Sequence, residues 1–213
     1  MTQKAILFDL DGTLTDSGEG IMNCARYTLG QLGMPVPEGD GLRVFVGPPL
    51  QETFRRFGVP DDLLEEAVRI YRSRYIPIGK FENFPYPGIR ELLEKLVADG
   101  HKLYVATSKP ENTSLEIMDH FDLSRYFTRI CGASTDFSRN TKAAVIEYLL
   151  EVSGRTEHTI MVGDTAFDVI GAKAHGISTI GVSWGYGDTA EMLEAGAAGI
   201  ANTMDELYEM LSR

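Results

Sequence analysis

The sequence contains few of the residues that indicate disulfides, membrane spans or nucleic-acid binding. Among 213 residues only two are cysteines, Cys24 and Cys131, and they lack metal-ligand spacing, so we expect free thiols in a reducing compartment. No apolar run is long enough to cross a bilayer, and no signal-peptide pattern opens the chain, which favours a cytoplasmic protein. Twenty basic residues against 31 acidic ones give a net charge of −11, which disfavours a nucleic-acid polymer as partner.

The first apolar stretch, residues 5–8, predicts a short buried strand. It ends in Asp9-Leu10-Asp11-Gly12, where a turn is expected. Sheets of α/β proteins bind ligands at the carboxyl ends of their strands. Two carboxylates held close together there repel each other, so one ionises easily and the other keeps its proton longer. Such a pair suits one nucleophile and one general acid/base. The alternative is that Asp9 and Asp11 only cap a turn.

The remaining sequence divides into two kinds of pattern. Residues 18–83 show helical periodicity and no convincing strand, which predicts an all-helical insert. From residue 84 onward, apolar strands alternate with amphipathic helices, as in a parallel, doubly wound sheet. We therefore expect an α/β, Rossmann-like core domain of residues 1–17 and 84–213, with a helical domain of residues 18–83 inserted in it. The four histidines lie away from the motifs and are expected at the surface.

Two further stretches carry groups that would suit a phosphate. The apolar strand 103–106 ends in Thr107 and Ser108, just before a predicted helix with free backbone N–H groups. Lys142 lies in the first turn of another predicted helix, where a cation opposes the helix dipole unless an anion is close. The alternatives are an ordinary helix N-cap for Thr107 and a solvated surface lysine for Lys142.

A fourth stretch, Gly163-Asp164 after the predicted strand 159–162, adds more carboxylates. Asp168 follows four residues later. Mg²⁺ prefers carboxylate oxygens, keeps several waters and leaves a position for a substrate phosphate. Asp164 could therefore bind the metal directly beside Asp9, and Asp168 could orient a bound water. The alternative for Asp164 is a helix N-cap.

These four stretches, in this order and each at a strand end, resemble the motifs of the haloacid dehalogenase-like hydrolases in their phosphatase form. The resemblance covers essentially the whole chain and implies a Mg²⁺-dependent phosphatase that acts through an aspartyl-phosphate. It implies Asp9 as nucleophile and Asp11 as general acid/base. The implied phosphate-binding residues are Thr107, Ser108 and Lys142, and the implied metal site contains Asp9, Asp11, Asp164 and Asp168.

The helical insert lies where this family places a small C1-type cap. The segment 46–50 looks like its substrate-facing loop, so Gly47 is expected to meet the substrate. Arg43, Arg55 or Lys80 is expected to meet a second anionic group. The alternative for these basic residues is simple solvent exposure.

The pattern is most similar to the phosphoglycolate phosphatase-like and 5′-nucleotidase-like branch of the family. The expected partner is a small phosphomonoester, either phosphoglycolate or a nucleoside 5′-monophosphate, and the expected state is a monomer or homodimer. One alternative is a β-phosphoglucomutase-like phosphomutase, and another is a non-catalytic binding protein on the same scaffold. A dehalogenase is disfavoured because Asp11 and Gly12-Thr13 fit the phosphatase form.

Overall fold

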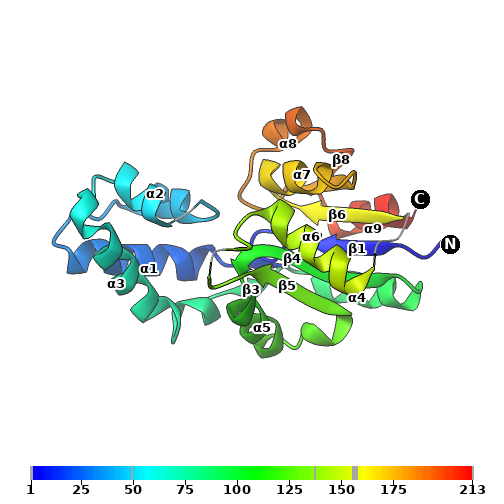
Figure 1. Ribbon diagram of the computed structural model, residues 1–213, viewed down its shortest axis with the longest axis horizontal. Helices are drawn as coiled ribbons and strands as arrows, with labels where there is room; N and C mark the ends of the chain where they lie inside the picture. Colours follow the sequence, from blue (N-terminus) through cyan, green and yellow to red (C-terminus); the bar gives the residue numbers. More distant parts are fainter. Residues whose placement is uncertain (1, 49, 137, 155–157, 213) are drawn as a thin grey trace. The chain divides into compact units, whose positions relative to one another are not determined.

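The computed structural model describes residues 2–48, 50–136, 138–154 and 158–212 (Figure 1). The chain divides into two compact units, Asp16–Phe84 and the remainder, which we call the helical unit and the sheet unit. Two short strands mark the boundary, β2 (Thr15–Asp16) and β3 (Phe84–Pro85), and they pair with each other. The predicted boundaries, after residue 17 and before residue 84, lie within two residues of this strand pair.

The sheet unit contains a six-stranded parallel sheet, which confirms the predicted α/β fold class. Its strand order is β5-β4-β1-β6-β7-β8. The strands are β1 (Ala5–Phe8), β4 (Lys102–Pro110), β5 (Arg129–Ala133), β6 (Thr159–Gly163), β7 (Ser178–Val182) and β8 (Gly199–Ala201). β1 lies in the middle and pairs with both β4 and β6, so the residue that follows it is placed at the centre of the sheet edge.

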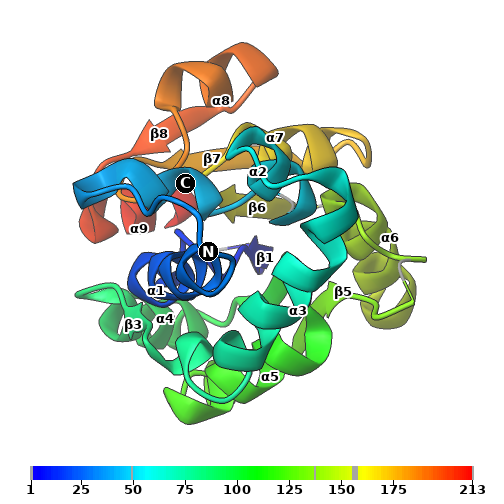
Figure 2. The same cartoon turned by 90° about the vertical axis from the view of Figure 1, so that its left-hand side faces the viewer.

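Helices cover both faces of this sheet because the side chains of β1 alternate between two apolar clusters (Figure 2). Ile6 and Phe8 pack with α4 (Ile89–Ala98), α5 (Glu111–His120) and α9 (Met204–Ser212). Ala5 and Leu7 pack with α6 (Lys142–Ser153) and α7 (Ala166–Lys173). Burial on both faces explains why β1 is apolar throughout. The remaining helices of the sheet unit are α8 (Thr189–Ala195) and the 3₁₀ turn η4 (Ser124–Tyr126).

The helical unit is built from α-helices and 3₁₀ turns around an aromatic core. Phe45 and Phe54 have ring centroids 4.9 Å apart, and Tyr71 lies 6.3 Å from Phe54. Its elements are α1 (Gly18–Gln31), η1 (Gly39–Phe45), α2 (Leu50–Arg56), η2 (Asp61–Leu63), α3 (Leu64–Tyr75) and η3 (Gly79–Phe81).

One expectation from the sequence is wrong. His101 is not at the surface but 6% exposed, and its Nδ1 accepts a hydrogen bond from Lys4 N at 3.2 Å. The ring fills the junction where β4 begins beside the segment that enters β1. Among the described residues, no helix combines the length and the apolar character that a membrane span requires.

Candidate active site

The carboxyl ends of three neighbouring strands carry the polar side chains of the candidate site. Asp9 follows β1, Thr107 lies near the end of β4, and Asp164 follows β6. Asp9 N donates to Val162 O at 2.9 Å, which keeps β1 and β6 aligned up to the carboxylate. The chain winds outward in opposite directions from β1, and α/β sheets bind ligands at such a point.

Lys142 lies among the carboxylates of this site. α6 begins at this residue and is capped by the hydroxyl of Thr141. Lys142 Nζ lies 2.7 Å from Oδ1 of Asp9 and 2.7 Å from Oδ1 of Asp168, and it donates to Ala106 O at 3.0 Å. The residue is 6% exposed, which excludes the alternative of a solvated surface lysine.

The buried groups of the site shift one another's protonation. Burial raises the pKa of Asp9 to about 6, although Lys142 opposes this rise. Burial, followed by the charges of Asp168 and Asp9, raises the pKa of Asp164 to about 7. Burial alone would lower the pKa of Lys142, but the facing carboxylates outweigh it and raise this pKa. The cluster therefore carries too little positive charge for its acids.

This shortage of positive charge fits a divalent metal ion. Asp9, Asp164 and Asp168 are buried, and each offers an oxygen within 4.8 Å of the others. Lys142 supplies one positive charge against these three carboxylates, so two negative charges are left over. A hard divalent cation with oxygen ligands would balance them.

Asp164 is fixed by one side-chain and one backbone hydrogen bond, and two glycines pack against it. The Thr13 hydroxyl donates to its Oδ1 at 3.2 Å, and Tyr186 N donates to its Oδ2 at 2.9 Å. A Cβ at Gly12 would lie 2.2 Å from Oδ2, and one at Gly185 would lie 2.3 Å from the Asp164 Cβ. No side chain larger than hydrogen fits at these two positions without displacing the carboxylate.

Asp168 uses its two oxygens in different ways. Oδ2 accepts from the backbone N–H of Thr165 at 3.0 Å and from its hydroxyl at 2.9 Å, which fixes the start of α7. Oδ1 faces Lys142. Because Thr165 is the N-cap of α7, the alternative of Asp164 as the cap is excluded.

Asp11 is paired with a lysine that the sequence analysis missed. Lys109 Nζ donates to Oδ2 of Asp11, and the side chain of Lys109 is only 7% exposed. Among the described residues, Oδ1 of Asp11 has no hydrogen-bond partner. The acidic cluster of Asp9, Asp164 and Asp168 does not include the Asp11 carboxylate, although the family resemblance placed it among the metal ligands.

A β-bulge brings Lys109 to this position. The register between β4 and β5 shifts between Ala106, opposite Cys131, and Pro110, opposite Ala133. Bulges of this kind re-aim side chains at the edges of sheets. The available signal was the position of Lys109 directly after Thr107-Ser108, but its partner depends on the bulge.

The two hydroxyls expected to bind phosphate have different environments. Thr107 is 2% exposed, and its hydrogen bond to Asp9 lowers the pKa of that carboxyl. Ser108 is exposed on the same bulge. α5 has Pro110 at its N-cap, which excludes the alternative of Thr107 as the cap.

The four substrate-facing residues expected from the insert all belong to the helical unit. Lys80 is 5% exposed, which excludes simple solvent exposure for this residue. Arg55 donates from Nε to Asp61 at 2.8 Å, and both side chains are exposed. Arg43 is an exposed residue of η1, and Gly47 has a φ of +102°. Pro49, in the predicted substrate loop, lies outside the described residues.

Comparison with known proteins identifies the family. The model of the family described as haloacid dehalogenase-like hydrolase matches residues 6–182. The chain belongs to the haloacid dehalogenase-like hydrolases. A predicted phosphatase from Clostridium acetobutylicum has a similar structure, with a TM-score of 0.91 and 40% identity over 100% of this chain and 99% of that one.

Three curated relatives of this hydrolase have different names. "Tyrosine-protein kinase PtkA" of Mycobacterium tuberculosis is 44% identical, over 98% of this chain and 72% of its own length. A "5'-nucleotidase" of Pseudomonas aeruginosa is also 44% identical, over 88% and 86%. A "Phosphoglycolate phosphatase" of Aquifex aeolicus is 34% identical, over 86% of each chain.

Proposed function

We propose that this protein is a Mg²⁺-dependent phosphatase that hydrolyses a small phosphomonoester through an aspartyl-phosphate on Asp9. The observation that carries the proposal is the separation of the two carboxylates after β1. Asp9 forms an ion pair with Lys142 among the buried acids, whereas Asp11 forms an ion pair with a different lysine, Lys109. Two neighbouring carboxylates in different environments suit two different roles.

In the first half of the reaction, a carboxylate oxygen of Asp9 attacks the phosphorus, and the bond from phosphorus to the ester oxygen breaks. Asp11 gives its proton to the departing alkoxide. We assign this proton to Oδ1, because Oδ2 accepts from Lys109. The products are the free alcohol and phosphorylated Asp9.

In the second half, a water molecule attacks the phosphorus, and Asp11, now a carboxylate, takes its proton. The bond from phosphorus to Asp9 breaks, which releases phosphate and restores both aspartates. The ion pair with Lys109 holds Asp11 to one side of Asp9, so that one group can act on the leaving oxygen and later on the water.

The charge of the phosphoryl group requires several positive partners. Lys142 Nζ is placed to bind a phosphoryl oxygen beside Asp9, and the Thr107 hydroxyl lies against the same carboxylate. Asp9, Asp164 and Asp168 would hold the metal. When bound, Mg²⁺ supplies charge neutralisation to the phosphoryl oxygens.

The helical unit is proposed to act as the cap that selects the leaving group. Phosphoglycolate and nucleoside 5′-monophosphates are the leading substrates, in line with the names of two relatives. Arg43 and Arg55 are the proposed contacts for a second anionic group, and Arg55 would exchange its ion pair with Asp61 for it. Gly47 is proposed to contact the substrate through its backbone.

A second candidate is transfer of the phosphoryl group from Asp9 to a hydroxyl other than water. The name of the mycobacterial relative, a tyrosine kinase, is the observation in its favour. A phosphomutase would use the same half-reaction. In either case, free phosphate would accumulate only when no acceptor hydroxyl other than water is present.

The test is phosphate release from a panel of phosphomonoesters that includes phosphoglycolate and nucleoside 5′-monophosphates. Wild type is assayed with Mg²⁺ and with EDTA, beside Asp9→Asn and Asp119→Asn. Asp119 lies exposed on α5, so it controls for the same chemical change outside the site. We expect release that requires Mg²⁺, is abolished by Asp9→Asn, and is retained by Asp119→Asn.

Substantial release by Asp9→Asn would overturn the proposed nucleophile. Release that persists in EDTA would overturn the metal requirement. Phosphate transfer to an added alcohol or tyrosine peptide, with little release to water, would favour the second candidate instead.

A further inference from the structure

Three ion pairs and three short stretches of chain form a closed ring at the edge of the sheet. Two of these ion pairs, Asp11 with Lys109 and Asp9 with Lys142, involve the proposed reacting carboxylates. The third pair, Glu111 with Arg139, joins the segment that carries Lys109 to the segment that leads into Lys142, and it touches neither carboxylate. In order, the ring runs through Asp9, Asp11, Lys109, Glu111, Arg139 and Lys142.

We propose that Glu111 and Arg139 are positioning residues that hold Lys109 and Lys142 against the two aspartates. Glu111 follows Lys109 by two residues, and Arg139 precedes Lys142 by three. Their ion pair is therefore a side-chain link between the two lysine-bearing segments that does not pass through the reacting groups, beside the hydrogen bond from Lys142 to Ala106 O. This inference rests on the proposed function for its catalytic consequence, but not for the structural link itself.

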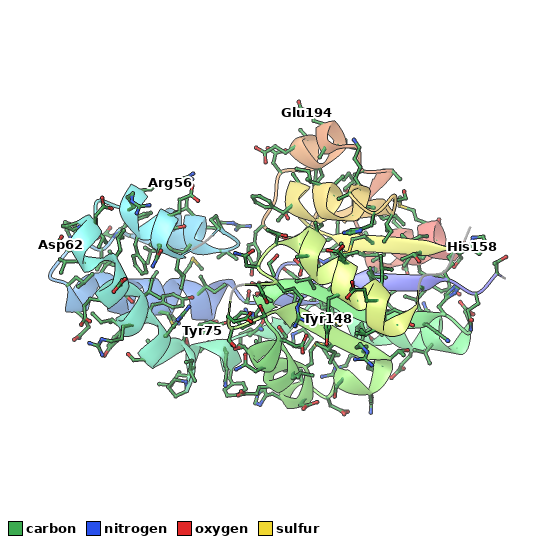
Figure 3. The ribbon with its side chains drawn as sticks, viewed as in Figure 1. Arg56, Asp62, Tyr75, Tyr148, His158 and Glu194 are labelled. Carbon is green, nitrogen blue, oxygen red and sulfur yellow. The ribbon has the colours of Figure 1, made fainter. Side chains whose placement is uncertain are left out.

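Arg139 makes three kinds of contact that fix its guanidinium. Nη2 donates to Oε2 of Glu111 at 2.9 Å, and Nε donates to Gly132 O at 2.8 Å. The guanidinium also lies 3.8 Å from the ring centre of Tyr148 on α6, a residue labelled in Figure 3. A planar group with donors in a fixed fork suits such a junction better than a flexible ammonium. Arg139 thus ties its loop to α6, β5 and α5 at once.

Gly132 joins the pair to the bulge of β4. Its N–H donates to Oε2 of Glu111 at 3.1 Å. A Cβ at this position would lie 2.5 Å from Lys109 O and 2.7 Å from Glu111 N. Both partners of the ion pair therefore hold the same residue of β5, one through its N–H and the other through its C=O. The bulge that carries Lys109 is clamped at this point.

The pair is also buried enough that its loss should have a measurable effect. The side chains of Arg139 and Glu111 are 18% and 31% exposed. A half-buried ion pair of the same kind joins Arg74 and Glu82 in the helical unit, at 2.8 Å with 21% and 27% exposure. That pair is a matched control, because its loss should alter stability without affecting the segments that carry Lys109 and Lys142.

Amide hydrogen exchange tests the structural link without any assumption about activity. Arg139→Gln and Glu111→Gln are compared with wild type and Arg74→Gln. We expect each of the first two variants to exchange several-fold faster over residues 107–112 and also over residues 141–145. Arg74→Gln is expected to leave both segments unchanged. Wild-type exchange of residues 107–112 in Arg139→Gln would overturn the inference.

Kinetics then test whether the link positions the lysines for turnover. We expect kcat to fall by roughly 10- to 100-fold in each variant, with a smaller change in KM, because small misplacements of catalytic groups cost rate. The double variant is expected to lose no more than either single variant, since the two residues act as one unit. Arg125→Gln, which removes an exposed ion pair with Asp122, serves as the kinetic control.

The outcomes separate the two proposals. A wild-type enzyme that releases no phosphate contradicts the proposed function, while the exchange data still decide the link. Changed exchange with kcat within about twofold of wild type would show a purely structural pair and overturn the positioning role. If Arg139→Gln does not fold, Arg139→Lys takes its place. It keeps the charge but loses the forked contact, so an intermediate loss of kcat is expected.

Discussion

The two units of this hydrolase differ in where their charged side chains lie. In the sheet unit, Asp9, Lys142, Asp164 and Asp168 are all buried within one cluster. In the described part of the helical unit, Lys80 is the only buried charged residue, and three ion pairs are exposed at its surface. Most buried side chains of that unit are apolar, and the aromatic rings of Phe45, Phe54 and Tyr71 pack together among them.

The difference is one of burial: the charged cluster of the sheet unit lies in its interior, whereas three ion pairs of the helical unit lie at its surface. Burying a charge is costly unless it is paired, so a cluster with two surplus negative charges weakens the fold that contains it. Aromatic packing carries no such cost. The sheet unit therefore accepts a local instability at the site, whereas the helical unit has no comparable cluster among its described residues. Four experiments test this contrast.

The largest effect is expected from Lys142→Met. Removing the cation leaves Asp9 and Asp168 buried without their shared partner, so the free energy of unfolding should fall by about 3–5 kcal/mol. Phosphate release should also be lost. Urea denaturation in EDTA measures the first effect. A loss below about 1 kcal/mol would show that the carboxylates do not depend on this lysine.

The next effect is the response to Mg²⁺. Ions that bind only the folded protein stabilise it, by about 2.7 kcal/mol at 100 times the Kd. We expect the melting temperature of wild type to rise with added Mg²⁺ and that of Asp164→Asn to rise much less. Asp62→Asn changes an exposed acid of the helical unit (Figure 3) and should keep the full rise. An equal rise in all three proteins would contradict a metal site in the sheet unit.

A smaller effect is a pair of opposite pH dependences in EDTA. Burial raises the pKa of Asp164 from 3.8 to about 7, so the folded state holds its proton longer than the unfolded state. Its contribution to stability should therefore fall as pH rises from about 4 to about 7. A hydrogen bond from Arg74 lowers the pKa of Glu82 below 4.5. Its contribution is present above that pH and is lost as pH falls through its folded pKa.

Unfolding free energies measured from about pH 3 to about pH 8 would separate these contributions. Asp164→Asn should remove part of the fall toward neutral pH, and Glu82→Gln should remove part of the fall in acid. Matching profiles for wild type and both variants would contradict the assignment.

The smallest effect is expected for Arg56→Gln. Arg56 pairs with Glu52 one helical turn away, at 71% and 50% exposure, and lies at the surface of the helical unit (Figure 3). Exposed pairs of this spacing contribute about 0.3–0.5 kcal/mol. The midpoint of urea denaturation should hardly move. A loss above about 1 kcal/mol would mean that the surface charges of this unit also support its fold.

Much of the sheet unit could be predicted from the sequence because its signals are local. The helix predicted just after Thr107 and Ser108 is α5, and the apolar run at 5–8 is β1. Parallel strands bring their carboxyl ends to one edge, so motifs far apart in the chain could be expected to meet. The structure places Asp9, Thr107 and Lys142 together there.

The features that escaped prediction depend on register and on distant partners. Lys109 reaches Asp11 only because β4 bulges against β5, and a bulge leaves no clear periodic signal. Glu111 and Arg139 meet only because α5 and the loop after β5 lie side by side. The two-residue strands β2 and β3 are too short to show alternation.

The central position of β1 also has a consequence for biosynthesis. Asp9 is translated before both strands that flank β1, which begin at Lys102 and Thr159. At about 5–20 residues per second, the first of these neighbours follows after on the order of 10 s. During that interval, β1 is an apolar segment without its sheet partners, a natural target for chaperones. The nascent chain therefore carries its proposed nucleophile in an inactive form until most of the sheet has been made.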